Sequence, residues 1–200
     1  DLQLVKVDKN GKKPLAGAVF ELTGTDLRGN TVTSQTVTTR EDGVASFTNL
    51  PFGTYSIEEK TAPSGYSLLA KPIDITINET NTPGEYVKGQ VISIGNIENE
   101  HIKLTVYKVD DKNQSVGLPG TTFVIQAGNL YVKATGSDGA YFYTDLVATE
   151  EDETKFVTAE GGIFTLEYLP LGSYTLVEID APDGYVISQE PQGFTVINST

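Results

Sequence analysis

The sequence predicts an all-β protein made of two tandem β-sandwich domains, and three observations support this. Glycine (20), proline (9) and many Thr, Val and Ile residues, without a long Leu/Ala/Lys/Glu run, indicate strands and turns. A 17-residue stretch occurs twice, at 50–66 and 169–185, with nine identical positions. The length of 200 residues fits two domains of about 100 each. We therefore expect domains at 1–99 and 100–200, with about seven strands in each.

The first domain is expected to hold strand segments that alternate with turn signals. Asp42-Gly43 is a hairpin signal, and the repeated stretch itself opens on a turn and continues as an alternating strand. A loop is expected at 78–84, before the last strand. The expected strand segments are 2–8, 15–22, 31–39 (one or two strands), 44–47, 50–66, 72–77 and 86–96. No helix is required.

The second domain repeats this order with one insertion. Segments 102–110, 118–123 and 161–164 match the early strands of domain 1. The insertion, at about 129–160, contains an aromatic hairpin (Leu130 to Tyr143) and an acidic run (150–153). Phe194-Thr-Val196 matches the penultimate strand of domain 1, and no counterpart of the last strand follows it. Either that strand is missing from this segment, or another chain supplies it.

Composition excludes several classes of function. The net charge of −13 argues against nucleic-acid binding, which needs a basic surface. With no Cys and a single His, His101, the chain has no disulfides, thiol nucleophile, Ser-His triad or His/Cys zinc site. No apolar run reaches transmembrane length, so this segment should make no membrane contact. The chain opens directly on a strand without a signal peptide, which is expected of an excised or mature segment.

Polar side chains occupy apolar strand faces at three places. Because successive strand residues point to opposite faces, Lys6 shares a face with Leu2 and Leu4. Its counterpart in domain 2 is Lys108. The same rule puts a glutamate on the apolar face of each repeated strand and Asn96 beside Ile92 and Ile94 on the last strand. These glutamates are Glu59 and Glu178.

Two interpretations of the Lys, Glu and Asn side chains remain open from alternation alone. One is structural: a buried Lys–Glu ion pair with an Asn satisfying spare donors, or a lysine that extends to solvent at a strand end. The other is chemical. Burial lowers a lysine pKa and raises a glutamate pKa, and a neutral amine beside a protonated carboxyl can attack an amide. In domain 1 the product would be a Lys6–Asn96 isopeptide bond, made once by self-modification without enzymatic turnover.

The repeated stretch resembles a known family. The Lys-Val-Asp opening and the Tyr-x-Ile/Leu-x-Glu-x-x-Ala-Pro-x-Gly-Tyr pattern are similar to the Cna B-type (prealbumin-like, SpaA-type) domains of Gram-positive adhesins and pilins. The resemblance covers essentially the whole chain as two copies. It implies immunoglobulin-like/prealbumin-like sandwiches and, in domain 1, a spontaneous isopeptide bond between Lys6 and Asn96 promoted by Glu59.

Domain 2 departs from this pattern at the acceptor. Lys108 and Glu178 match the lysine and the catalytic glutamate, but the only late Asn is Asn198. It aligns with Glu79, in the loop after the penultimate strand of domain 1, so we expect it to be a poor acceptor.

The resemblance implies a structural stalk module of a cell-wall-anchored or pilus-associated surface protein, without a cofactor or metal. Its partners would be neighbouring domains of the same protein or pilus. The alternative is a ligand-binding adhesin that contacts a host extracellular-matrix protein through the insertion. Tyr131, Tyr141, Phe142 and Tyr143 could line that surface, although aromatic residues in a hairpin more often pack across strands. The acidic run is expected to be a solvated loop tip, with a calcium site as the less favoured interpretation.

Overall fold

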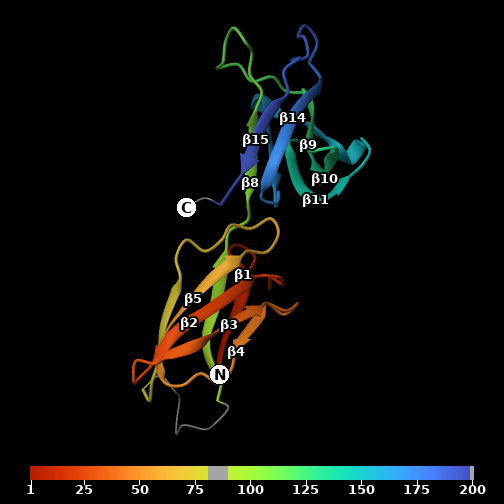
Figure 1. Ribbon diagram of the computed structural model, residues 1–200. Coiled ribbons are helices and arrows are strands. Elements are labelled where there is room, and N and C mark those ends of the chain that lie inside the picture. The colour runs from red at the N-terminus through yellow and green to blue at the C-terminus, as the bar shows by residue number, and fades with distance from the viewer. Residues whose placement is uncertain (81–89, 199–200) are drawn as a thin grey trace. The chain divides into compact units, whose positions relative to one another are not determined.

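The computed structural model describes residues 1–80 and 90–198 (Figure 1). The chain separates into two compact units, Asp1–His101 and Ile102–Asn198, called domain 1 and domain 2 below. In the described residues of both, nearly all of the regular secondary structure is β-strand, which confirms the all-β prediction. The two helical turns in the described residues, η1 (Asp152–Thr154) and η2 (Glu160–Gly162), are short 3₁₀ segments in domain 2.

Domain 1 is a sandwich of a three-stranded and a four-stranded sheet. The first has the order β4-β1-β7 and the second the order β3-β2-β5-β6. The strand β1 pairs antiparallel with β4 and parallel with β7. The strands are β1 (Leu2–Asp8), β2 (Val19–Asp26), β3 (Thr31–Thr38), β4 (Val44–Phe47), β5 (Gly53–Thr61), β6 (Ile73–Ile77) and β7 (Ile92–Asn99).

The last strand of domain 1 extends further than expected. It was predicted over 86–96, of which 86–89 lie outside the described residues, and it continues to Asn99. The expected loop at 78–84 also lies largely outside them.

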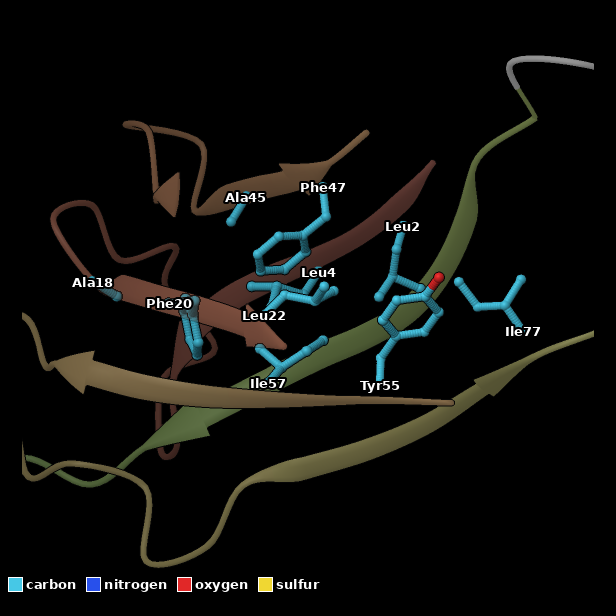
Figure 2. Close-up of a cluster of buried hydrophobic side chains, with 10 residues drawn as sticks. All are labelled: Leu2, Leu4, Ala18, Phe20, Leu22, Ala45, Phe47, Tyr55, Ile57 and Ile77. Carbon is cyan, nitrogen blue, oxygen red and sulfur yellow. The ribbon is translucent and has the colours of Figure 1, made fainter. Parts of the chain in front are cut away.

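The core of domain 1 lies between its two sheets. Figure 2 shows Phe20, Leu22 and Ile57 of the four-stranded sheet facing Leu4 and Phe47 of the three-stranded sheet. All five side chains are fully buried. Alternation explains the pattern, because every second residue of β1, β2 and β5 points inward.

Domain 2 repeats the strand order of domain 1 up to the counterpart of β6, with extra strands inserted, and the described residues include no counterpart of β7. Its pairing runs without interruption through β15-β14-β9-β10-β11-β13-β8, and β12 pairs separately with β9. The strands are β8 (Lys103–Tyr107), β9 (Thr122–Ala127), β10 (Leu130–Ser137), β11 (Ala140–Val147), β12 (Lys155–Val157), β13 (Ile163–Glu167), β14 (Gly172–Asp180) and β15 (Gln192–Val196).

In domain 2, the insertion connects two groups of strands whose counterparts in domain 1 form separate sheets. The predicted aromatic hairpin is β10–β11; β10 pairs with β9, and β11 pairs in parallel with β13. Tyr141 of β11 is buried and meets the rings of Phe156 and Phe164 edge-on, with centroids 5.1 and 6.1 Å away. The insertion is therefore part of the core of domain 2.

Candidate functional site: two buried lysine–glutamate centres

Lys6 is held inside domain 1 by its backbone as well as by its side chain. Its amide donates to the carbonyl of Gly43 (2.7 Å), and its carbonyl accepts from the amide of Leu15 (2.9 Å). Gly43 has φ +74°, and a Cβ there would lie 2.4 Å from the Lys6 carbonyl oxygen. Only a glycine at this position allows the two backbone segments to lie so close without strain. The Lys6 side chain is 0% exposed, with Nζ 5.8 Å from the centroid of the Phe20 ring.

Glu59 projects from β5 towards the same point. Its side chain is buried, and Oε1 lies 3.5 Å from Lys6 Nζ. The other oxygen, Oε2, accepts a hydrogen bond from the amide of Leu69 (2.9 Å), which belongs to the segment after β5. The structure thus brings together the lysine and the glutamate singled out from the sequence.

Asn99 is the third member of this centre. It is 2% exposed and lies between the other two side chains. Lys6 Nζ donates to Asn99 Oδ1, and Asn99 Nδ2 donates to Glu59 Oε1 (2.9 Å). An amine, a carboxamide and a carboxyl group therefore meet in one buried cluster, the Lys6–Glu59–Asn99 centre.

Asn96 does not take this position, and the expectation that it would is wrong. It is exposed, and the reason is a β-bulge: Gln3 pairs with Ser93 but Val5 pairs with Asn96, so β7 carries one extra residue. Gly95, with φ +82°, lies in this bulge. The bulge reverses the alternation, so the inward positions become Ile97 and Asn99. Gly95, a glycine inside the predicted strand, was the feature of the sequence that could have indicated the bulge.

Burial sets the electrostatics of the centre. Loss of hydration lowers the pKa of Lys6 to about 8, although the charge of Glu59 opposes this. Loss of hydration likewise raises the pKa of Glu59 above its usual range, against the effect of Lys6 and the hydrogen bonds from Leu69 and Asn99. At pH 7 about one Lys6 in ten is neutral, roughly 300-fold more than for a solvated lysine. The centre therefore provides an amine able to act as a nucleophile.

Domain 2 repeats the lysine and the glutamate. Lys108 makes the same backbone hydrogen bonds as Lys6, donating to Gly162 (2.7 Å) and accepting from Leu118 (2.9 Å). Gly162 matches Gly43, with φ +73° and a Cβ position 2.2 Å from the Lys108 carbonyl oxygen. Lys108 Nζ lies 2.7 Å from Glu178 Oε2. The two centres are thus built on one local framework.

The domain 2 centre is less complete than that of domain 1. The Lys108 side chain is 21% exposed, and that of Glu178 is 4% exposed. Among residues 1–80 and 90–198, the buried Oε1 of Glu178 has no hydrogen-bond partner. Asn198 lies beyond the far end of β15: Leu176 pairs with Gln192, and the chain then runs away from Glu178 for six residues. At about 3.3 Å per residue this is roughly 20 Å, which removes Asn198 as an acceptor.

The other candidates from the sequence lie apart from both centres. Two carboxylates of the acidic run, those of Glu151 and Glu153, flank Lys133 at 3.0 and 2.9 Å, and Asp152 pairs with Lys155 at 3.0 Å. Within residues 1–80 and 90–198, no group of three His, Cys, Asp or Glu side chains could hold a metal ion.

The aromatic residues of the insertion divide between core and surface. Tyr141 is in the core, whereas Phe142 is 43% exposed and lies 6.4 Å from the ring of Tyr168. Tyr131 and Tyr143 are half-buried. In the described part of the chain, no helix is long and apolar enough to span a bilayer.

Comparison with known proteins places these features in a family. The trypsin-resistant surface T6 protein of Streptococcus pyogenes serotype M6 is 28% identical over 180 residues, which cover 89% of this chain and 29% of that protein. The solved structure of the Bacillus anthracis TIE protein is 30% identical, with a TM-score of 0.50 over 98% of this chain and 31% of that one. A streptococcal ancillary pilin is 25% identical, with a TM-score of 0.41 over 98% of this chain and 57% of that one.

The chain therefore spans about three-tenths of the length of the first two proteins. The model of the SpaA prealbumin-like fold domain matches it twice, at residues 1–90 and 102–200. These matches cover nearly the whole sequence, one in each domain, and each includes the lysine and the glutamate of its centre, whereas the first match ends before β7. The chain belongs to the SpaA prealbumin-like fold domain family and contains two copies of that domain.

Proposed function

We propose that this chain is a stalk segment of a Gram-positive surface protein or pilus, and that domain 1 forms an isopeptide bond between Lys6 and Asn99. The observation that carries the proposal is the contact of Lys6 Nζ with the Asn99 carboxamide, which also donates to Glu59. The similarity to a streptococcal surface protein supports an extracellular, cell-wall or pilus location.

The reaction is a transamidation in which atoms balance. Neutral Lys6 Nζ attacks Asn99 Cγ, and a new C–N bond forms. Glu59, hydrogen-bonded to Asn99 Nδ2 and 3.5 Å from Lys6 Nζ, takes a proton from the attacking nitrogen and delivers it to the leaving one. The bond from Cγ to Nδ2 breaks, and ammonia leaves. The reaction occurs once. Glu59 is restored, but the Lys6 amine and the Asn99 carboxamide are consumed, so there is no catalytic turnover.

The position of the bond suits a domain under tension. The strands β1 and β7 are parallel neighbours, and Lys6 and Asn99 both lie near their carboxyl ends. A pull between residues 1 and 101 would pass along β1 as far as Lys6, across the bond, and out through Asn99. Residues 7–98 would then carry no load. Neighbouring domains of the same protein or pilus would be joined in series through such covalent paths.

Intact-mass measurement tests the proposal directly. The purified chain should be lighter than its sequence mass by one ammonia. Asn99→Ala, Lys6→Ala and Glu59→Ala should each restore the unmodified mass. Asn96→Ala is the matched control, because it changes an exposed Asn on the same strand and should leave the ammonia loss intact. An unshifted mass for the parent protein would exclude the bond.

A second candidate function is ligand binding through the insertion, favoured by the exposure of Phe142 beside Tyr168. A host extracellular-matrix protein would be the partner. Deleting residues 129–160 is unsuitable as a test, since it removes Tyr141 and Phe156 from the core. Phe142→Ser changes only the surface, and unchanged binding of the variant to matrix proteins would remove this candidate.

A further inference from the structure

Each copy of the repeated stretch ends in a tyrosine whose side chain contacts the turn after the first strand of its domain. In domain 1 the Tyr66 side chain hydrogen-bonds to Asp8, which lies two residues after Lys6. In domain 2 the Tyr185 side chain hydrogen-bonds to Asp110, at the equivalent position. Because both domains make this contact, it belongs to the local framework that they share.

Asp8 is a fixed and ionised acceptor for the tyrosine. It is 5% exposed, and its Oδ1 accepts hydrogen bonds from the amides of Asn10 (2.8 Å) and Gly11 (2.6 Å). Burial favours the neutral carboxyl group, but these two bonds and the one from Tyr66 outweigh it, so the pKa of Asp8 lies below its usual value. Hydrogen bonds to an ionised group are stronger than those between neutral groups. The contact therefore anchors Tyr66 to the end of β1.

The backbone that begins at this tyrosine also contacts the end of β7. Tyr66 pairs with His101 in an isolated antiparallel β-bridge. The amide of Ser67 donates to the carbonyl of Glu100 (3.0 Å). Since Glu100 and His101 directly follow Asn99, these contacts fix the backbone that carries the carboxamide.

The same segment ends at the glutamate of the centre. The amide of Leu69 donates to Glu59 Oε2 (2.9 Å), and the other oxygen, Oε1, accepts from Asn99 Nδ2 (2.9 Å). The four residues 66–69, called the Tyr66–Leu69 segment below, therefore contact all three parts of the centre. They contact the turn after Lys6, the residues after Asn99, and Glu59 itself.

We propose that the Tyr66–Leu69 segment is a positioning element for the cross-linking reaction, anchored by the hydrogen bond between the Tyr66 side chain and Asp8. This role rests on the Lys6–Asn99 bond proposed above. The segment forms no bond to the reacting atoms. It acts by holding Glu59 Oε1 against the Asn99 carboxamide while the amine approaches. Reactions of this kind are sensitive to geometry, because a misplacement of about 1 Å can slow them by about a hundredfold.

The rate of ammonia loss tests this role. The full chain is prepared by chemical synthesis and kept in guanidinium, so that it starts unlinked, and its intact mass is followed after dilution into native buffer. Tyr66→Phe should slow the loss of one ammonia by about tenfold, the effect of one hydrogen bond to a charged group. The rate of folding, followed separately by tyrosine fluorescence, should change much less. Tyr185→Phe is the matched control, because it removes the same hydroxyl from domain 2 and should leave the rate unchanged.

A double-mutant cycle tests whether the tyrosine acts through Asp8. Asp8→Ala removes the acceptor, so Tyr66→Phe should slow the reaction of this variant by less than about twofold. Asp8→Asn keeps a carbonyl oxygen for the two backbone amides and a side-chain amide that can donate to the tyrosine hydroxyl. It should therefore restore most of the rate lost in Asp8→Ala. A full tenfold slowing by Tyr66→Phe in the Asp8→Ala protein would overturn the anchor.

The pKa of Glu59 provides a measurement that needs no cross-link. Burial raises this pKa, and the hydrogen bond from Leu69 is one of the interactions that oppose the rise. If Tyr66 holds the segment in place, its replacement weakens that hydrogen bond. Carbon-13 NMR titration should then give a Glu59 pKa higher by about 0.5–1 in Tyr66→Phe/Asn99→Ala than in Asn99→Ala. A general loss of stability would not shift this pKa.

Two results would overturn the positioning role. One is an unchanged rate of ammonia loss together with an unchanged Glu59 pKa in the Tyr66→Phe proteins. The other is a rate of ammonia loss that falls only by the factor by which folding slows. An unshifted mass for the folded parent chain would instead contradict the proposed bond. In that case the Glu59 pKa still decides whether the segment positions this carboxylate.

Discussion

The two domains share one local framework but differ in what completes it. Lys6 and Lys108 have equivalent backbone hydrogen bonds. Each contacts a glutamate, which lies on β5 in domain 1 and on its counterpart β14 in domain 2. In domain 1 the strand β7 then supplies Asn99 and closes the centre. In domain 2 one oxygen of the Glu178 carboxylate is without a partner in the described part of the chain, and the Lys108 side chain is partly exposed. The lysine–glutamate pair alone does not make the three-residue centre, because in domain 1 the strand β7 contributes the Asn99 carboxamide, and Lys6 is fully buried where Lys108 is not.

The largest expected difference between the domains is in thermal stability. The proposed bond from residue 6 to 99 would close a loop of more than ninety residues, which should stabilise domain 1 by about 4–5 kcal/mol. Asn99→Ala should lower the melting temperature of domain 1 by roughly 15–30 °C and leave that of domain 2 unchanged, as followed by calorimetry. Asn96→Ala is the control. Equal melting temperatures for Asn99→Ala and Asn96→Ala would argue against a covalent constraint.

The pH dependence of the unlinked protein should reveal the lowered pKa of Lys6. Burial lowers the pKa of Lys6 in the folded chain to about 8, below the unfolded value of 10.5, so the unfolded state binds more protons between these limits. Asn99→Ala keeps the Lys6 amine free, so that this difference can be measured. The free energy of unfolding of domain 1 should therefore rise with pH across this window, by up to about 3 kcal/mol. Denaturant titrations from pH 7 to 10.5 measure this rise. The double variant Lys6→Met/Asn99→Ala should lack it, and a rise of the same size there would assign the effect to other groups.

The glycines beneath the two lysines provide a test of their equivalence. An added Cβ at Gly43 or Gly162 would lie 2.4 or 2.2 Å from the lysine carbonyl oxygen, at positive φ. Alanine at either position should cost about 2–3 kcal/mol in its own domain. Gly17 and Gly120 are matched controls, because they have similar φ but no atom within 4 Å of the added Cβ, so only backbone strain remains. The measurement is chemical denaturation of each variant. If alanine cost no more at Gly43 and Gly162 than at the controls, the close approach would be unimportant.

The smallest effect is expected at the bulge of β7. Gly95 has φ +82° with open space around its Cβ position, so Gly95→Ala should cost only about 1 kcal/mol. Asn99 should still react, so the intact mass should keep its loss of one ammonia. Transfer of the cross-link to Asn96, detected by peptide mapping, would show that this glycine determines which Asn faces Lys6.

Alternation along the strands predicted much of the fold and two of the three side chains of the Lys6–Glu59–Asn99 centre. The duplicated stretch indicated two sandwiches, and period two placed Lys6 and Glu59 on inward faces, where the structure has them. Asn99 was missed because a single extra residue at the bulge reverses the period, and alternation carries no information about such a shift. Gly95 within the strand was the only local sign of it.

The role of the insertion could not be read from its sequence. A hairpin was predicted over 130–143, and the structure has it over 130–147, but its pairing with β9 and β13 depends on tertiary packing that no local pattern specifies. Tyr141 and Phe142 are neighbours in sequence, and one is core while the other is surface. Which of them packs inward follows from the register of β11 with β13, which becomes visible only in the assembled sheet.

The parallel pairing of β1 and β7 also determines how far domain 1 can lengthen. Residues 7–98 represent roughly 300 Å of contour length when fully extended. With the proposed bond in place, none of this length is released by a pull on the two ends, so the domain behaves as an inextensible link. A domain without the bond would unfold under the same pull and absorb mechanical work as it lengthens. In a chain of such modules, the presence or absence of an Asn carboxamide in contact with the buried lysine would thus determine which domains stay rigid and which unfold and dissipate mechanical energy.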